Sequence, residues 1–275
     1  MARCLADDAG NPGRGSHGLA QRAQAVIDRG RQEVAALINA ADASRVAFTL
    51  SATDALNMAI KGVLHRAPDR PRPHVITTML EHNAVRRPVN QLQENATIGL
   101  TVLPFDEQGF VTPGAVEQAW TDQTRLVVLN SPSNVIGTIQ AAAIGQVVRQ
   151  RGGLLLLDAC QTAGAVPIDI EAQGVDLLAA SGHKALLGPP GTGFLYVGPR
   201  VDLDTFQAWR EGGTGGDSVQ PVQPREMPML LEAGTPNTVG IAGLTAAIMS
   251  RDQSQRAQDL QHERALMQQL RDALA

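Results

Sequence analysis

Short apolar runs alternate with stretches of helical periodicity along most of this 275-residue chain. The apolar runs predict strands, because each is short and bounded by turn residues. They lie at residues 46–50, 74–78, 98–103, 125–130, 154–158, 176–181 and 193–197. Helical patterns fall between them at 54–65, 85–94 and 141–150, with a short helix that Pro113 opens. Such alternation is typical of a mostly parallel sheet with helices on both faces, so we predict a three-layer αβα fold of the α/β class.

Both ends of the chain are predicted to be helical. One amphipathic helix covers residues 16–40, and two further helices cover 241–251 and 256–274. Residues 210–240 are rich in Gly, Pro and Thr and predict a long functional loop. We expect three parts: an N-terminal segment and helix (1–45), a ligand-binding large domain (46–240) and the helical start of a further domain (241–275). The last helix needs a missing domain or a partner subunit to pack against.

The composition excludes several classes of protein. At 43% hydrophobic and 18% charged residues, with apolar runs of only strand length, the chain has no membrane span. A net charge of -4 and a pI near 5.9 leave no basic face for nucleic acid. Cys4 and Cys160 cannot build a disulfide framework, and no Cys/His cluster has the spacing of a metal site. The N-terminus lacks the apolar core of a signal peptide, so we expect a cytoplasmic protein.

Polar residues follow three of the predicted strands at the point where each strand ends. Asn134 comes after strand 125–130, and Asp158 and Gln161 come at the end of strand 154–158. The third group is Ser181, His183 and Lys184. Ligands of parallel α/β sheets bind outside the carboxyl ends of the strands, so we predict that these residues line one cleft.

Asp158 and Lys184 carry the chemistry of this predicted cleft. A carboxylate at the end of an all-leucine strand needs a cation or several donors, and the protonated pyridine nitrogen of pyridoxal phosphate would satisfy it; capping of the next helix is the alternative. Lys184 lies in the small-residue turn Ser181-Gly-His-Lys184, which suits an amine that forms a Schiff base. A solvated surface lysine is the alternative, although Lys61 is the chain's other lysine.

Two further strand-to-helix junctions could contact an anion or a ring. Ser51-Ala-Thr53 lies where backbone amides of a helix N-terminus can bind a phosphate, or where a hydroxyl merely caps the helix. His82 could lie flat on an aromatic cofactor or bond to the backbone. The glycine-rich segment 188–193 is not an ATPase phosphate loop, because Phe194 and Leu195 stand where Lys and Ser or Thr are required.

Seven motifs in order resemble the class V aminotransferases, and within them the cysteine desulfurases and selenocysteine-lyase-like enzymes. The resemblance covers nearly the whole chain. The motifs are Asn11-Pro-Gly-Arg-Gly-Ser-His17, Ser51-Ala-Thr-Asp-Ala-Leu-Asn57, Glu81-His82, Asn130-Ser-Pro-Ser-Asn134, Asp158-Ala-Cys-Gln161, Ser181-Gly-His-Lys184 and Glu232-Ala-Gly-Thr-Pro-Asn237.

The resemblance implies a pyridoxal-phosphate enzyme of fold type I with a mostly parallel, mixed sheet, in which 46–240 binds the cofactor. By this resemblance, Lys184 holds the cofactor covalently, Asp158 pairs with the pyridine nitrogen, His82 stacks on the ring and Gln161 meets the phenolic oxygen. The phosphate is held by Ala52, Thr53, Ser181 and His183. Asn134 lies near the ring and the substrate carboxylate, and Thr235 reaches the phosphate of the neighbouring subunit. A homodimer, with 212–216 in its interface loop, follows. Lys184 and His82 would act in catalysis on L-cysteine or a similar amino acid, and a protein could accept the sulfur.

The sequence departs from this family at both ends. We expect the family's first strand to be missing, and likewise the small C-terminal domain that supplies a nucleophilic cysteine and a carboxylate-binding arginine. Cys160 is expected to be a buried, inert thiol, and Cys4 to lie in an untethered segment. Three functions therefore stay open: a partial cysteine desulfurase, another class V enzyme such as an aminotransferase or a cysteine or selenocysteine lyase, and a non-catalytic remnant.

Overall fold

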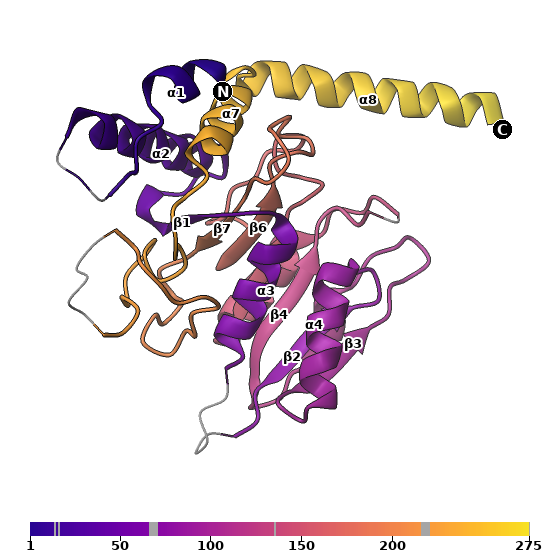
Figure 1. Cartoon of the computed structure of the whole chain (residues 1–275). Helices are drawn as coiled ribbons and strands as arrows, with labels where there is room; N and C mark the ends of the chain where they lie inside the picture. The colour runs from indigo at the N-terminus through magenta and orange to yellow at the C-terminus, as the bar shows by residue number, and fades with distance from the viewer. Residues whose placement is uncertain (14, 16, 66–70, 135, 216–220, 275) are drawn as a thin grey trace.

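A computed structural model describes residues 1–13, 15, 17–65, 71–134, 136–215 and 221–274. Its centre is a seven-stranded sheet in the order β1-β7-β6-β5-β4-β2-β3 (Figure 1). Three predicted features touch residues outside this description: Ser16, the first residue of the predicted N-terminal helix, residues 66–70, which precede strand 74–78, and Gly216, the last residue of segment 212–216. The strands are β1 (Val46–Thr49), β2 (His74–Thr78), β3 (Gly99–Leu103), β4 (Thr124–Asn130), β5 (Leu154–Asp158), β6 (Leu177–Ser181) and β7 (Gly193–Val197).

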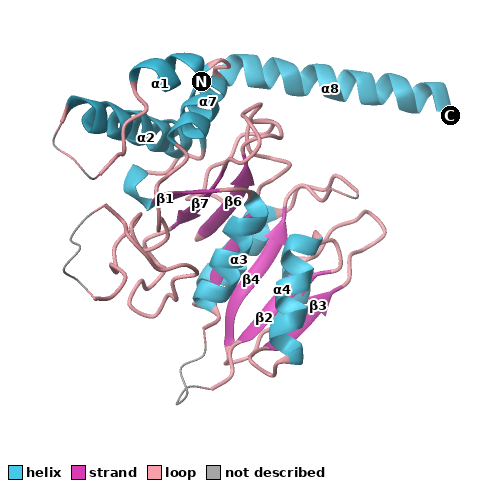
Figure 2. Ribbon diagram, in the orientation of Figure 1, coloured by secondary structure: helices cyan, strands magenta, loops and turns pink. Residues whose placement is uncertain are grey.

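Helices cover both faces of this sheet, which confirms the predicted three-layer α/β fold (Figure 2). One face carries α3 (Ala52–Val63) and α4 (Asn83–Glu94); the other carries α2 (Gly18–Leu37), α5 (Pro113–Ala119), α6 (Ala141–Gln150) and α7 (Thr238–Met249). Successive strand residues divide between the two cores. In β5, Leu156 packs with α3 and α4, whereas Leu155 and Leu157 pack with α2, α6 and α7. This period of two is what a central strand buried on both faces requires.

The sheet is mixed only at β7. This strand runs antiparallel to both β6 and β1, while β6, β5, β4, β2 and β3 pair in parallel. Strand β1 therefore points the same way as β6, so that its end, at Thr49, lies at the same edge as Asn130, Asp158 and Ser181. That edge is where the polar residues of the predicted cleft collect.

The N-terminal segment is attached to the body of the molecule, so the expectation that Cys4 lies in an untethered segment is wrong. Residues Ala2–Asp7 form helix α1, in which Cys4 is buried with 6% of its surface exposed. Arg22 of α2 donates to the carbonyl of Asp7 at 3.0 and 3.2 Å and forms an ion pair with Asp8 at 3.3 Å. A helix of six residues is too short to show a periodicity, and its anchor lies on another helix.

The C-terminal helix α8 (Gln253–Leu274) extends away from the rest of the molecule, and none of its described residues is buried (Figure 1). It begins three residues earlier than predicted, because Asp252 and Gln255 form reciprocal side-chain to backbone hydrogen bonds at 2.8 and 2.9 Å. The short helix η1 (Ala43–Arg45) leads into β1. In the described part of the chain, no helix combines the length and apolarity needed to cross a membrane.

Candidate cofactor site

A cleft of 290 Å³ opens at the carboxyl edge of the sheet. Nine of the ten predicted site residues line it: Ala52, Thr53, His82, Asn134, Asp158, Gln161, Ser181, His183 and Lys184. They come from five separate segments of the chain, between residues 52 and 184, and meet because parallel strands end at one edge. The predicted convergence of the strand ends on one cleft is therefore observed.

Asp158 forms the buried base of the cleft. It is the last residue of β5 and is 5% exposed. Its Oδ1 accepts a hydrogen bond from the backbone N–H of Cys160 at 3.0 Å. The residues that follow form turns, not a helix, so the predicted alternative of a helix cap does not apply. A second hydrogen bond joins the carboxylate to the side chain of Cys160. Because a carboxylate has about four lone-pair sites, Asp158 still has some to offer a cation.

Lys184 lies in a tightly closed turn between β6 and β7, residues 182–192, called the Lys184 turn below. The amide of Gly182 donates to the carbonyl of Thr192 at 2.8 Å, and that of Gly188 donates to the carbonyl of Gly182 at 2.7 Å. The lysine carbonyl itself accepts from Leu187 at 2.8 Å. The side chain is half-buried and lines the cleft, unlike the solvated lysine of the alternative interpretation.

The N-terminus of α3 faces the same cleft. Ser51 is the N-cap, and its Oγ accepts from the amide of Asp54 at 3.2 Å. Thr53 is therefore free of the capping role and its side chain is exposed. The amide of Ala52 donates to Oγ of Ser181 at 3.1 Å, which links the helix N-terminus to the end of β6. Backbone donors and two hydroxyls at a helix N-terminus suit an anion.

His82 caps α4 and faces the cleft with the rest of its ring. Its Nδ1 accepts from the amide of Ala84 at 3.1 Å, so the backbone bond of the alternative interpretation forms. This bond does not exclude contact with a cofactor, because the exposed ring still lines the cleft. In a neutral imidazole, an accepting Nδ1 leaves the proton on Nε2. Asn134, Gln161 and His183 are exposed at the rim.

Two polar residues at the back of the cleft received no role in the sequence analysis. Oε1 of the buried Glu81 accepts from Thr78 Oγ1 at 2.7 Å and from the amide of Asn130 at 3.1 Å. Its Oε2, and Oδ1 of Asn130, are buried and have no partner within the described part of the chain. Burial raises the pKa of Glu81 from 4.5 to about 8 despite these hydrogen bonds, and the charge of Asp158 adds to the effect. The sequence does hold a signal for both residues: Glu81 follows the end of β2 and Asn130 ends β4, as the other residues of the cleft follow or end their strands.

Cys160 also lines the cleft, with 9% of its surface exposed. Burial raises the pKa of its thiol, and the neighbouring carboxylate of Asp158 raises it further. A nucleophilic cysteine needs the thiolate form, which this environment disfavours.

Comparison with known proteins assigns the chain to a family. The profile of the family described as Aminotransferase class-V matches residues 1–275. The chain belongs to the class-V aminotransferases.

Its relatives within the class-V aminotransferases include proteins named cysteine desulfurases. The chain is 43% identical to cysteine desulfurase IscS of Pseudomonas entomophila over 211 residues, and this alignment covers 75% of this chain and 51% of that protein. It is 36% identical over 240 residues to a probable cysteine desulfurase of Methanothermobacter thermautotrophicus, covering 86% and 58%. The apo structure of a cysteine desulfurase from Thermococcus onnurineus superposes with a TM-score of 0.90 at 28% identity, covering 100% and 68%. The chain spans about half the length of the curated relatives it matches.

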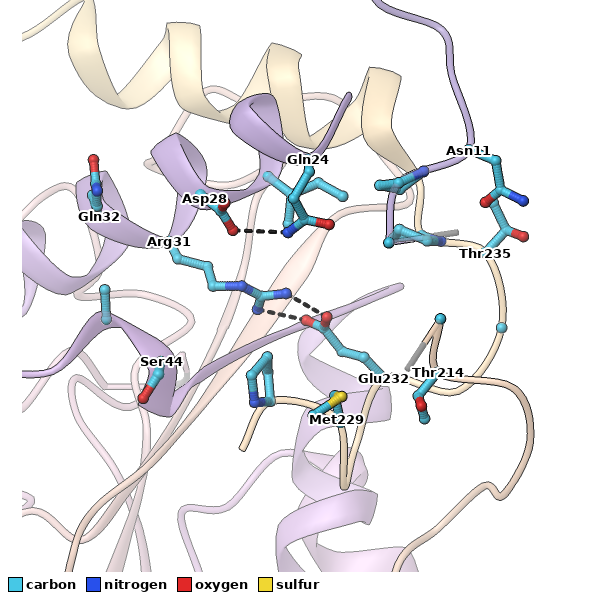
Figure 3. A pocket seen from close by; sticks show the side chains of 18 residues that line it. Asn11, Gln24, Asp28, Arg31, Gln32, Ser44, Thr214, Met229, Glu232 and Thr235 are labelled. Carbon is cyan, nitrogen blue, oxygen red and sulfur yellow. Dashed lines mark hydrogen bonds and ion pairs between the residues drawn. The ribbon is translucent and has the colours of Figure 1, made fainter. Parts of the chain in front are cut away.

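Thr235 is the one predicted site residue of this class-V aminotransferase chain that lies outside the cleft. It lines a separate cavity of 450 Å³ between the N-terminal segment, α2 and residues 214–215 and 228–236 (Figure 3). Its side chain is exposed. Whether it contacts a second copy of the chain stays a prediction.

A buried ion pair forms one wall of this second cavity (Figure 3). The guanidinium of Arg31 binds both carboxylate oxygens of Glu232 and donates to the carbonyl of Val46 at 2.5 Å. Oε1 of Glu232 also accepts from the amide of Phe48 at 2.6 Å. The pair thus satisfies backbone groups along the free edge of β1, where no further strand pairs among the described residues.

Proposed function

We propose that this chain binds pyridoxal 5'-phosphate in the cleft at the strand ends, with Lys184 as the amine that holds it. The observation that carries the proposal is the meeting of three chemically different groups in one cleft of 290 Å³. These groups are the lysine, the buried carboxylate of Asp158 and the donor-rich N-terminus of α3. The volume is about that of small cofactor sites.

The donor set of the cleft fits the two ends of this cofactor. The amides at the start of α3, with the hydroxyls of Thr53 and Ser181 and the ring of His183, would hold the phosphate. Asp158 would pair with the pyridine nitrogen and so receive the positive partner that its burial requires.

When bound, pyridoxal phosphate supplies an electron sink for the α-carbon of an amino acid. The chain's own residues supply position and proton transfer. Nζ of Lys184 would take the proton from the substrate α-carbon, and the ring of His82 would cover one face of the cofactor. Gln161 would hold the phenolic oxygen, and Asn134 would orient the substrate carboxylate.

We further propose that the substrate is L-cysteine and that the chain carries the cofactor-binding part of a cysteine desulfurase, in which alanine forms and the sulfur passes to a thiolate. The names of the relatives support this choice. Neither cysteine of this chain suits the accepting role, because both are buried and burial raises the pKa of each thiol. The acceptor would be another thiol, and Thr235 would contact the cofactor phosphate of a second subunit in a homodimer.

The presence of only two lysines makes a decisive experiment simple. Pyridoxal phosphate is added to the purified chain, the visible absorbance is recorded, and borohydride is used to fix the cofactor for peptide mapping. We expect modification of Lys184 and its loss in Lys184→Ala. The matched control is Lys61→Arg, because Lys61 is half-buried against Trp209, 3.9 Å from the ring centroid, far from the cleft.

The outcomes separate the competing functions. A reducible band that survives in Lys184→Ala would show the lysine assignment to be wrong. Absence of any band in the native chain would favour a non-catalytic remnant. If the cofactor binds, release of alanine from L-cysteine in the presence of a thiol acceptor supports desulfuration, whereas formation of a keto acid points to transamination.

A further inference from the structure

An arginine at the junction of α7 and α8 reaches the Lys184 turn from outside the cleft. Nη2 of Arg251 donates to the carbonyl of Ala185, the residue directly after Lys184. Its Nη1 forms an ion pair with Oδ2 of Asp259 in α8 at 3.1 Å. The arginine side chain is 21% exposed, and its Nε is buried with no partner among the described residues. An unpaired buried donor costs free energy, so this placement is not explained by stability alone.

The turn is packed closely against the elements that present this arginine. A Cβ on Gly188 would lie 2.8 Å from a methyl carbon of Leu244 in α7. A Cβ on Gly164, whose φ is +89°, would lie 2.7 Å from the carbonyl oxygen of Ala185. The carbonyl that Arg251 binds therefore lies in a closely packed, half-buried part of the turn. A hydrogen bond from a charged donor is stronger than one between neutral groups.

We propose that Arg251 is a positioning residue for Lys184, and this inference rests on the proposed role of that lysine. The two carbonyls of the turn have different partners. That of Lys184 is satisfied within the turn by Leu187, whereas that of Ala185 depends on a residue 66 positions away. Arg251 thereby fixes the peptide plane between Ala185 and Leu186, one residue beyond Lys184, and so holds the part of the turn from which the lysine side chain leaves the backbone.

The ion pair with Asp259 connects Arg251, and through it the Lys184 turn, to α8. Asp259 is 54% exposed, so the pair by itself contributes little to stability. It does align the guanidinium, since one nitrogen faces α8 and the other faces the turn. None of the described residues of α8 is buried, and Arg256 of this helix also donates to the carbonyl of Ile248 in α7. Because Asp259 belongs to α8, its ion pair with Arg251 couples the orientation of that helix to the Lys184 turn.

Amide hydrogen exchange of the whole chain without cofactor tests the inference directly. We expect Arg251→Ala to speed exchange at Leu187 and Gly188 by about tenfold or more, because both amides bond within the turn. Exchange at Leu156 in β5 should stay unchanged. Arg251→Lys keeps the charge but cannot span both partners, so a rise of about threefold is expected. The matched control is Arg149→Ala, which breaks the surface pair with Glu171 at 3.0 Å.

A second readout separates positioning from general damage to the cleft. We expect Arg251→Ala to slow the formation of borohydride-fixable pyridoxal phosphate by about tenfold, but to leave non-covalent affinity unchanged in the Lys184→Ala background. A loss of affinity in both backgrounds would overturn the inference, as would native exchange rates at Leu187 and Gly188 in Arg251→Ala. If that variant does not fold, native rates in Arg251→Lys overturn it. If the native chain binds no cofactor, the proposed function fails, and the exchange data alone still decide the role of Arg251.

Discussion

Replacing Glu81 with glutamine should remove a pH-dependent loss of stability that arises at the back of the cleft. Oε1 of a glutamine can accept the same two hydrogen bonds, from Thr78 and Asn130. What the substitution removes is the ionisable proton. Because the side chain is buried and the neighbouring Asp158 is acidic, ionisation of Glu81 in the folded chain is unfavourable.

The sign and size of the effect follow from the two pKa values. Burial raises the pKa of Glu81 from 4.5 to about 8, so between these values the folded chain binds more protons than the unfolded chain. The free energy of unfolding therefore falls as the pH rises, by about 1.4 kcal/mol per pH unit. Between pH 5.5 and pH 7.5 the native chain should lose about 3 kcal/mol relative to Glu81→Gln.

Urea denaturation of the cofactor-free chain at these two pH values measures the effect. With an m value of about 3 kcal/mol per M, the midpoint of the native chain should fall relative to that of Glu81→Gln by about 1 M between pH 5.5 and pH 7.5. Cofactor must be absent, because its binding would add its own stabilisation. Glu263→Gln, at an exposed position of α8, is the control and should follow the native chain at both pH values.

Parallel pH dependence of the native chain and Glu81→Gln would refute the reasoning. It would mean that Glu81 is ionised in the folded chain, with a cation or water on the oxygen that has no partner here.

Three further predictions concern packing, charge and thiol chemistry. Gly145→Ala should destabilise the chain by about 3 kcal/mol or more in urea, because its Cβ would lie 1.9 Å from a carbonyl oxygen, whereas Gly114→Ala, with nothing within 4 Å, should change stability by less than about 1 kcal/mol. Glu232→Gln should cost about 3 kcal/mol or more, since it leaves the buried charge of Arg31 without its counterion, and equal urea midpoints would contradict this. Cys160 should resist a thiol reagent at pH 8 in the folded chain and react in urea; rapid labelling of the folded chain would show that its thiolate is accessible.

The order of elements could be predicted from the sequence because it depends on local pattern. Strands β2, β5 and β7 and helix α6 have the predicted bounds, since a short apolar run or a helical period is complete within its own segment. The site residues at the ends of β5 and β6 could also be placed, because parallel strands end together. Helix α1 and the burial of Cys4 could not be predicted, because the segment is held in place by Arg22 of another helix.

Local sequence thus determined the α/β class and the set of polar residues at the carboxyl edge of the sheet. Only the tertiary structure decided which of them are buried and what holds them. Arg31 meets Glu232 across 201 positions, Glu81 meets Asn130 across 49, and Arg251 meets Ala185 across 66. The physical reason is that a buried polar atom must find a partner wherever the packed chain brings one, and no periodicity in the sequence records such a distance.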